Sequence, residues 1–287
     1  MEVWPHVQER VRLLWVCKSV HWQISSNVRR AAGEYLGDLG EVLALIHGGA
    51  MVVLHLRSGA TERFALAWKF SEWTFFCRVS EFGVLGVGSR PAAVQTYAIE
   101  LRRGGLADGG KLNIARSSPG LMKYGEQVYV FGGYNWNEDV LPTEIYNITS
   151  RTFRLAASMH FPRDGFSPCL WEDGIYLLDV GYSHRAIERF SLLSETIAIL
   201  TWLLPQALTD NSIAYIHKGA VFLLSNTGLL ATTVLGSQDW RTRQISTRAG
   251  CGLSNTPPVL LGNRLAWVKR GEGSLVQLDL DSCVLIE

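Results

Sequence analysis

The sequence has 287 residues, of which 47% are hydrophobic and 18% charged, and its formal net charge is +1. This composition excludes a disordered chain, and the balanced charge argues against binding to nucleic acid or to an acidic membrane. The length suits one large β domain or two small domains. Five cysteines without a CxxC pair argue against a disulfide framework or a zinc site, so we expect reduced thiols and no cofactor.

The first 27 residues form an N-terminal segment distinct from the rest of the chain. Residues 10–17 and 20–24 predict two strands, which either join the last repeat unit and close a ring or remain from a seventh unit. A short amphipathic helix over residues 3–14 is the alternative. The segment lacks the basic and apolar regions of a signal peptide, and no apolar run is long enough to span a bilayer. We therefore expect a soluble, cytoplasmic protein.

One apolar strand type recurs along the rest of the chain. Its copies begin at residues 42, 84, 128, 175, 221 and 265, which are 42, 44, 47, 46 and 44 residues apart. This period suits the four-stranded unit of a β-propeller and is too long for leucine-rich or ankyrin repeats. Each copy is predicted to be the second of four strands.

The other strands of each unit are predicted from the apolar runs around these copies. A first strand is expected at 119–123, third strands at 51–56, 93–101, 144–148, 186–192, 229–235 and 274–280, and fourth strands at 62–67, 152–156, 196–203, 241–246 and 283–286. A four-stranded sheet cannot bury both faces alone, whereas sheets packed around an axis can. The sequence therefore predicts an all-β protein with a single propeller domain over residues 28–287.

A repeated motif is clearest between residues 113 and 181. The doublet Gly132-Gly133 follows the third copy of the recurring strand, Tyr146 lies in the next strand, and Phe153 comes seven residues later. Glycines at a strand end permit positive φ and close approach of the backbone between units. The aromatic rings are expected to fill the wedge between neighbouring sheets.

The same stretch keeps a common register in two successive units. Arg116 and Arg163 are 47 residues apart, as are Tyr129 and Tyr176. In these features the chain resembles the kelch-repeat family. The resemblance implies a kelch-type β-propeller with four antiparallel strands per blade and six blades, or seven if the N-terminal strands form one more. It also implies an interaction module, because kelch propellers usually bind protein partners.

In kelch-like propellers, partners commonly bind one face, which is formed by loops after the second strand and by linkers between blades. Carried onto this sequence, the partner-binding candidates are Arg116, Ser117, Tyr134, Asn135, Trp136, Arg163, Asp164, His184, Arg185 and Asn211. An exposed Trp beside Arg has the chemistry of an interface hot spot, and Arg can clamp a carboxylate. The alternative is that Arg116 and Arg163 bond carbonyls of the adjacent blade and that Trp136 lies on an apolar loop floor.

Signals for catalysis are weak. The seven histidines form no HxH or HExxH pattern, and no GxSxG or P-loop motif occurs. The carboxylate pairs at 138–139 and 172–173 are predicted to lie in solvated turns. We therefore expect no metal and a non-catalytic scaffold or adaptor that binds a protein or peptide. The alternative is a propeller enzyme, a hydrolase or oxidase, with its site at the axial mouth.

Overall fold

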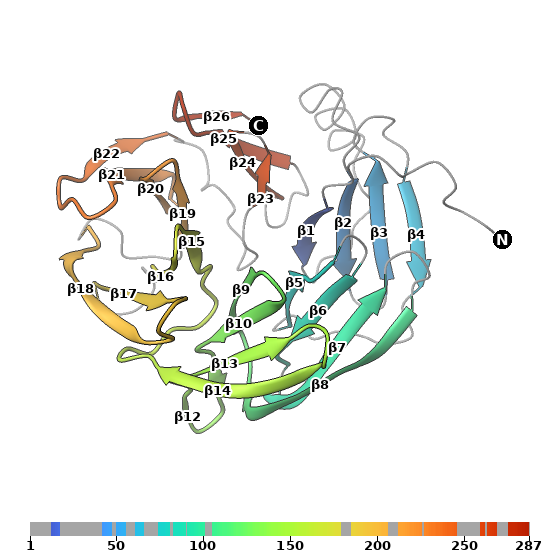
Figure 1. Cartoon of the computed structure of the whole chain (residues 1–287). Coiled ribbons are helices and arrows are strands. Elements are labelled where there is room, and N and C mark those ends of the chain that lie inside the picture. Colours follow the sequence, from blue (N-terminus) through green and yellow to red (C-terminus); the bar gives the residue numbers. More distant parts are fainter. Residues whose placement is uncertain are drawn as a thin grey trace.

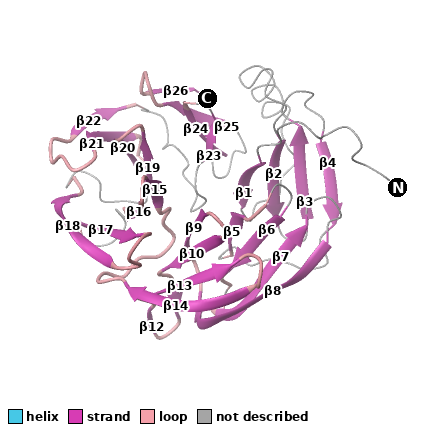
Figure 2. Cartoon of the chain, viewed as in Figure 1, coloured by secondary structure: helices cyan, strands magenta, loops and turns pink. Residues whose placement is uncertain are grey.

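A computed structural model gives the three-dimensional structure of the chain (Figure 1). The residues that it describes are 13–17, 42–47, 50–55, 61–65, 74–80, 83–89, 91–100, 105–178, 185–205, 212–225, 227–245, 259–261, 263–268 and 275–286. Their regular structure consists of β-strands, so the predicted all-β class is confirmed (Figure 2). Across these ranges no helix has the length and hydropathy needed to cross a membrane.

Six sheets of four strands follow one another along the described parts of the chain. The first and second sheets contain β1 (Leu13–Cys17), β2 (Val42–His47), β3 (Ala50–His55) and β4 (Thr61–Ala65), then β5 (Phe75–Arg78), β6 (Gly83–Val87), β7 (Ala93–Glu100) and β8 (Gly105–Arg116). The third contains β9 (Gly120–Tyr124), β10 (Gln127–Phe131), β13 (Pro142–Asn147) and β14 (Thr152–Ser158). The short strands β11 (Tyr134–Asn135) and β12 (Glu138–Asp139) form a separate hairpin between β10 and β13.

The last three sheets repeat this plan. The fourth contains β15 (Cys169–Trp171), β16 (Gly174–Leu177), β17 (Ala186–Ser191) and β18 (Ile197–Leu203). The fifth contains β19 (Ser212–His217), β20 (Ala220–Ser225), β21 (Leu229–Val234) and β22 (Arg241–Gln244). The sixth contains β23 (Val259–Leu261), β24 (Arg264–Val268), β25 (Leu275–Asp279) and β26 (Val284–Ile286). All six copies of the recurring strand are the second strands of their sheets, as predicted.

The N-terminal strand β1 pairs with β2 in the first sheet. Their pairing is parallel and joins Leu13 to Val42 and Cys17 to Ile46, whereas the other ladders in the described sheets are antiparallel. A parallel pair needs a long connection, which the intervening residues 18–41 are long enough to supply. The strand thus differs in place from both sequence-based expectations, since it joins neither the last sheet nor a seventh one. The second predicted strand, at 20–24, lies outside the described residues.

Successive sheets pack face to face in chain order. Val128 and Val130 of β10 pack with Leu85 of the second sheet, whereas Tyr129 and Phe131 pack with Phe190 of the fourth. Because neighbouring side chains of a strand point to opposite faces, the third sheet buries both of its faces. The core clusters between the fourth and fifth sheets and between the fifth and sixth sheets continue this arrangement. Figure 1 shows the sheets following one another along a curve, with the fourth strands on its outer side.

Among the six fourth strands, β8 is the one for which the sequence predicted no residues. It has 12 residues, and its pairing with β7 shifts register between Ala93 and Gln95 and again between Gln95 and Tyr97. The glycines of its first half break the alternation of apolar and polar residues that marks a strand. Its C-terminal residues reach the third sheet, where they contact the side chain of Glu144.

Candidate functional site

The hairpin formed by β11 and β12, residues 134–139, follows the second strand β10 and carries two exposed aromatic side chains. Tyr134 is 40% exposed and Trp136 is 50% exposed. The Tyr134 hydroxyl donates a hydrogen bond of 3.0 Å to the carbonyl of Trp136, which closes the turn of the hairpin. Asn135 is half-buried and pairs with Glu138 across the hairpin. The predicted loop candidates Tyr134, Asn135 and Trp136 therefore lie together.

Backbone hydrogen bonds fix the base of this hairpin to the linker that precedes the third sheet. The Ser117 amide donates to the Tyr134 carbonyl at 2.9 Å, and the Tyr134 amide donates to the Ser117 carbonyl at 3.0 Å. The Ser117 hydroxyl donates to the same Tyr134 carbonyl at 2.9 Å. Ser117, which the sequence also predicted as a site residue, thus holds the hairpin through its backbone and side chain.

The Gly132-Gly133 doublet holds the hairpin base against the following linker. Gly132 has φ +60° and Gly133 has φ +98°, and the Gly133 amide donates to the Arg163 carbonyl at 2.8 Å. A Cβ on Gly132 would lie 2.2 Å from the Arg163 carbonyl oxygen, and one on Gly133 would lie 2.5 Å from that of Ser117. The predicted roles of the doublet, positive φ and close backbone approach, are confirmed. The base of the hairpin is therefore clamped between two linkers.

The predicted aromatic wedge is present between the second and third sheets. The Tyr146 and Phe153 rings lie 4.7 Å apart between centroids, and Tyr146 is 3% exposed. Tyr146 packs with Leu85 and Leu112 of the second sheet. Tyr146 is thus buried in the sheet interface, and the half-buried Phe153 packs against it.

Arg116 is buried beside the hairpin base rather than exposed on a binding face. Its side chain is 0% exposed, and it donates to the carbonyls of Gly132 at 2.9 Å and of Pro142 at 3.2 Å. A third bond of 2.7 Å reaches the Glu144 carboxylate, which is also 0% exposed. Burial lowers the pKa of Arg116, and the Glu144 charge opposes that shift. Because arginine ordinarily titrates far above neutral pH, the guanidinium stays charged.

Glu144 collects donors from the end of β8, and we call this group the Glu144 cluster: Asn113, Ile114, Arg116 and Glu144. The Asn113 amide nitrogen donates to one carboxylate oxygen at 2.7 Å, and its side-chain nitrogen donates to the same oxygen at 2.8 Å. The Ile114 amide donates to the other oxygen at 3.1 Å. The cluster therefore ties the last strand of the second sheet to the third sheet through a fully bonded buried carboxylate.

A second copy of this arrangement, the Glu188 cluster, consists of His160, Arg163 and Glu188. The His160 amide donates to Glu188 at 2.6 Å, and its Nδ1 lies 2.9 Å from the same oxygen. Arg163 donates to the other carboxylate oxygen at 3.3 Å and to the Ala186 carbonyl at 2.7 Å. His160 follows Asn113 by the same 47 residues that separate the two arginines. The device thus repeats between the third and fourth sheets.

The predicted role of Arg116 and Arg163 as arginines that clamp a partner's carboxylate therefore needs correction. Their side chains are 0% and 1% exposed and already bond two buried glutamates of the chain itself. Both arginines also donate to backbone carbonyls, which was the alternative considered from the sequence. The cause is that each guanidinium group bonds a buried glutamate and a backbone carbonyl of the following sheet.

The remaining predicted residues are distributed along the same linkers. Asp164 is half-buried and engaged in contacts with other residues. Arg185 is exposed, and its Nε donates to the Leu204 carbonyl at 2.6 Å, which ties the start of β17 to the end of the fourth sheet. His184 and Asn211 lie outside the described residues.

The sequence-based prediction missed both glutamates, although a signal for them exists. Each lies two residues before a buried aromatic residue of the third strand, Glu144 before Tyr146 and Glu188 before Phe190. Each also follows an Arg by 28 or 25 residues. Two carboxylates buried at equivalent strand positions require cationic or amide partners, so the pattern could have indicated both clusters.

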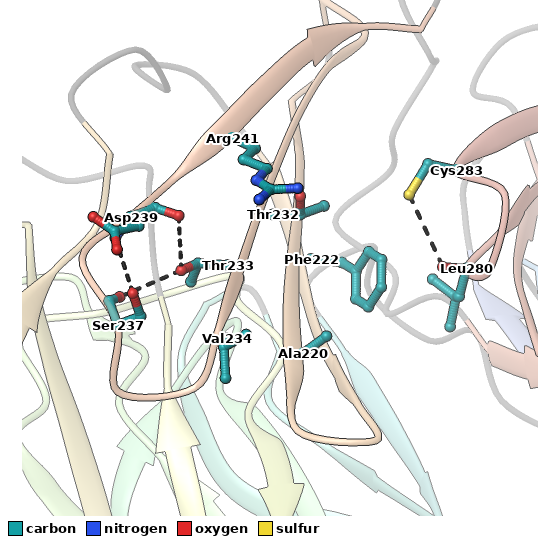
Figure 3. Close-up of a pocket in the computed structure, with 10 residues that line it drawn as sticks. All are labelled: Ala220, Phe222, Thr232, Thr233, Val234, Ser237, Asp239, Arg241, Leu280 and Cys283. Atoms are coloured by element: carbon teal, nitrogen blue, oxygen red, sulfur yellow. Dashed lines mark hydrogen bonds between the residues drawn. The ribbon is translucent and has the colours of Figure 1, made fainter.

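A groove of about 430 Å³ lies between the fifth and sixth sheets (Figure 3). It is lined by Ala220, Phe222, Thr232, Thr233, Val234, Ser237, Asp239, Arg241, Leu280 and Cys283. Figure 3 shows Asp239 and Arg241 on the fifth-sheet side and Leu280 with Cys283 on the sixth-sheet side. Because Arg241 and Asp239 carry opposite charges, the lining favours neither a cation nor an anion.

Burial and hydrogen bonding shift the pKa values of several side chains in the described part of the chain. Burial raises the pKa of the Cys77 and Cys169 thiols to about 12, so both stay protonated at neutral pH. The pKa of Asp108 is lowered, chiefly by the hydrogen bond from the Gly110 amide. Across the described ranges, no three His, Cys, Asp or Glu side chains come together as metal ligands.

Comparison with known proteins assigns no family, because neither a protein-family model nor a curated protein matches the chain. The kelch resemblance therefore depends on the residues between 113 and 181 themselves. In the structure those residues build the third sheet, the hairpin and the Glu144 cluster, and they supply His160 and Arg163 to the Glu188 cluster. The hairpin with its clamped base is the candidate functional site.

Proposed function

We propose that the chain is a kelch-type β-propeller of six blades that serves as a scaffold or adaptor and binds a protein or peptide through the face carrying the hairpin. Six four-stranded sheets in chain order, packed face to face from the second sheet to the sixth, support this architecture. We place the protein in the cytoplasm, because Cys77, Cys169 and Cys283 are free thiols.

The observation that carries the proposal is the exposure of Tyr134 and Trp136 on a rigid base. Both rings are at least 40% exposed, although large aromatic side chains are usually buried. The double hydrogen bond to Ser117 and the glycine doublet hold the hairpin in place before a partner arrives. Preorganised aromatic side chains are the residues that most often dominate binding energy at protein interfaces.

Comparative affinity capture with the purified full chain tests the proposal. The test variant is Tyr134→Ser with Trp136→Ser, and the control is Tyr124→Ser at the end of β9. Tyr124 is 48% exposed and lies at the opposite end of β10 from the hairpin, so the control removes similar surface from the same sheet.

We expect the double variant to lose partners that the wild type and the control both retain. A lost hot spot of about 2 kcal/mol weakens binding about 30-fold, which is enough to remove a partner from a washed capture. Circular dichroism of all three proteins checks that the fold is unchanged. An identical set of partners for the double variant and the control would refute binding through the hairpin.

A further inference from the structure

The exposed charge of the hairpin is negative. Glu138 and Asp139 are both exposed, and within the described part of the chain no ion pair or side-chain hydrogen bond engages their carboxylates. The nearby cations Arg116 and Arg163 are buried, and each already bonds a buried glutamate. At the hairpin itself, a partner therefore meets the carboxylates of Glu138 and Asp139, whereas the guanidinium groups of Arg116 and Arg163 are buried.

The hairpin register places aromatic and acidic groups together. Tyr134 pairs with Asp139 across the two strands, and Asn135 pairs with Glu138. Residues directly opposite in an antiparallel pair project their side chains from the same face, so the Tyr134 ring and the Asp139 carboxylate share one face. Trp136 lies in the turn, and its carbonyl accepts the Tyr134 hydroxyl hydrogen bond of 3.0 Å. The hairpin thus combines two exposed rings with two exposed carboxylates in six residues.

We propose that the segment bound by the hairpin is basic and presents arginine or lysine to these rings and carboxylates. This inference rests on the proposed function. A guanidinium group can stack on an aromatic ring and at the same time donate two hydrogen bonds to a carboxylate. An acidic segment would meet like charges at Glu138 and Asp139 and would be disfavoured. The hairpin is therefore expected to select a basic segment, whereas a surface of exposed arginines would select an acidic one.

Fluorescence anisotropy with three labelled peptides of equal length tests this inference. Their charged positions are all arginine, all lysine or all glutamate, separated by glycine and serine. The proteins are the wild type, the neutral variant Glu138→Gln with Asp139→Asn, and the control Tyr124→Ser with Glu126→Gln. Tyr124 and Glu126 form an exposed aromatic and acidic pair at the opposite end of β10. All four substituted positions are exposed, so the variants are expected to fold.

We expect the arginine peptide to bind the wild type and the control alike, and the lysine peptide to bind less tightly. Removing two exposed ion pairs should weaken binding about fivefold, and raising the salt from 0.05 to 0.5 M should weaken it further. The inference is overturned if the arginine peptide does not bind, if the neutral variant binds it as tightly as the wild type, or if the glutamate peptide binds equally well. Affinity capture that still depends on Tyr134 and Trp136 would then leave the proposed function intact.

Discussion

Replacing Glu144 with glutamine removes the anion bonded to the buried Arg116 side chain while keeping the shape of the site. The carboxylate is 0% exposed and accepts bonds from the Asn113 and Ile114 amides as well as from Arg116. Removing one partner of a buried ion pair typically costs about 3–5 kcal/mol, because the other charge stays buried without compensation. We expect the free energy of unfolding to fall by about that amount.

Equilibrium unfolding in urea, followed by the fluorescence of the ten tryptophans, measures this change. The matched control is Glu195→Gln, which breaks the ion pair with Arg154 on the surface. The two side chains of that pair are 36% and 50% exposed, so its loss should cost no more than about 1 kcal/mol. If Glu144→Gln costs no more than Glu195→Gln, the buried cluster does not stabilise the fold as described.

A double-mutant cycle separates the ion pair from the other bonds of the carboxylate. Arg116→Met removes the buried cation, and the double variant with Glu144→Gln removes both charges. Each single variant leaves one buried charge without its partner, whereas the double variant leaves none. We therefore expect the loss in free energy of unfolding for the double variant to be at least about 2 kcal/mol smaller than the sum of the two single losses. Additive losses would instead assign the stabilisation to the bonds that the carboxylate accepts from the Asn113 and Ile114 amides of β8.

Three further predictions concern single positions. Gly132→Ala should cost at least about 2 kcal/mol more than Gly125→Ala in urea unfolding, because both have positive φ but only Gly132 packs against a linker carbonyl. Equal losses would contradict the role of close approach. His160→Asn should change the free energy of unfolding by less than about 1 kcal/mol, because the Glu144 cluster has asparagine at the equivalent position; a larger loss would show that the imidazole is required. Iodoacetamide at pH 8.5 should leave Cys169 unlabelled in the folded protein, since burial raises its pKa to about 12, and should label the half-exposed Cys283. Peptide mass spectrometry reads this pattern, and rapid labelling of Cys169 before unfolding would be inconsistent with its burial.

The strands could be predicted because apolar side chains mark their positions along the chain. The recurring second strands are rich in apolar residues because both of their faces can be buried. In the third sheet, Val128 packs with the second sheet and Tyr129 with the fourth, and both side chains are buried. Sheets with two buried faces read as continuous apolar runs, which makes their spacing visible. The long strand β8 escaped prediction because Gly109 and Gly110 interrupt its pattern.

The candidate site could be predicted only in part, because burial depends on contacts between residues that are distant in sequence. Trp136 and Tyr134 follow a strand end, so their exposure could be expected from local sequence. From local sequence, Arg116 was interpreted as an exposed linker residue. Its burial depends on the carboxylate of Glu144, which lies 28 residues later in the chain and bonds it in the structure. The pairing of β1 with β2 was equally inaccessible, since an apolar strand is compatible with several sheet edges.

Because the hairpin is anchored at its base, the stability of the third sheet does not depend on the sequence of the hairpin tip. It is attached by backbone hydrogen bonds at Ser117, Gly133 and Val140 and by the Ser117 hydroxyl, and all three residues precede or follow the exposed tip. In the part of the chain that the structure describes, the exposed residues from Trp136 to Asp139 belong to neither hydrophobic cluster of the third sheet. The tip can therefore change in length or composition while the third sheet folds as before, as loops on rigid scaffolds commonly do. A library of tip sequences displayed on this base would thus give binding loops of new specificity, with both glutamate clusters retained.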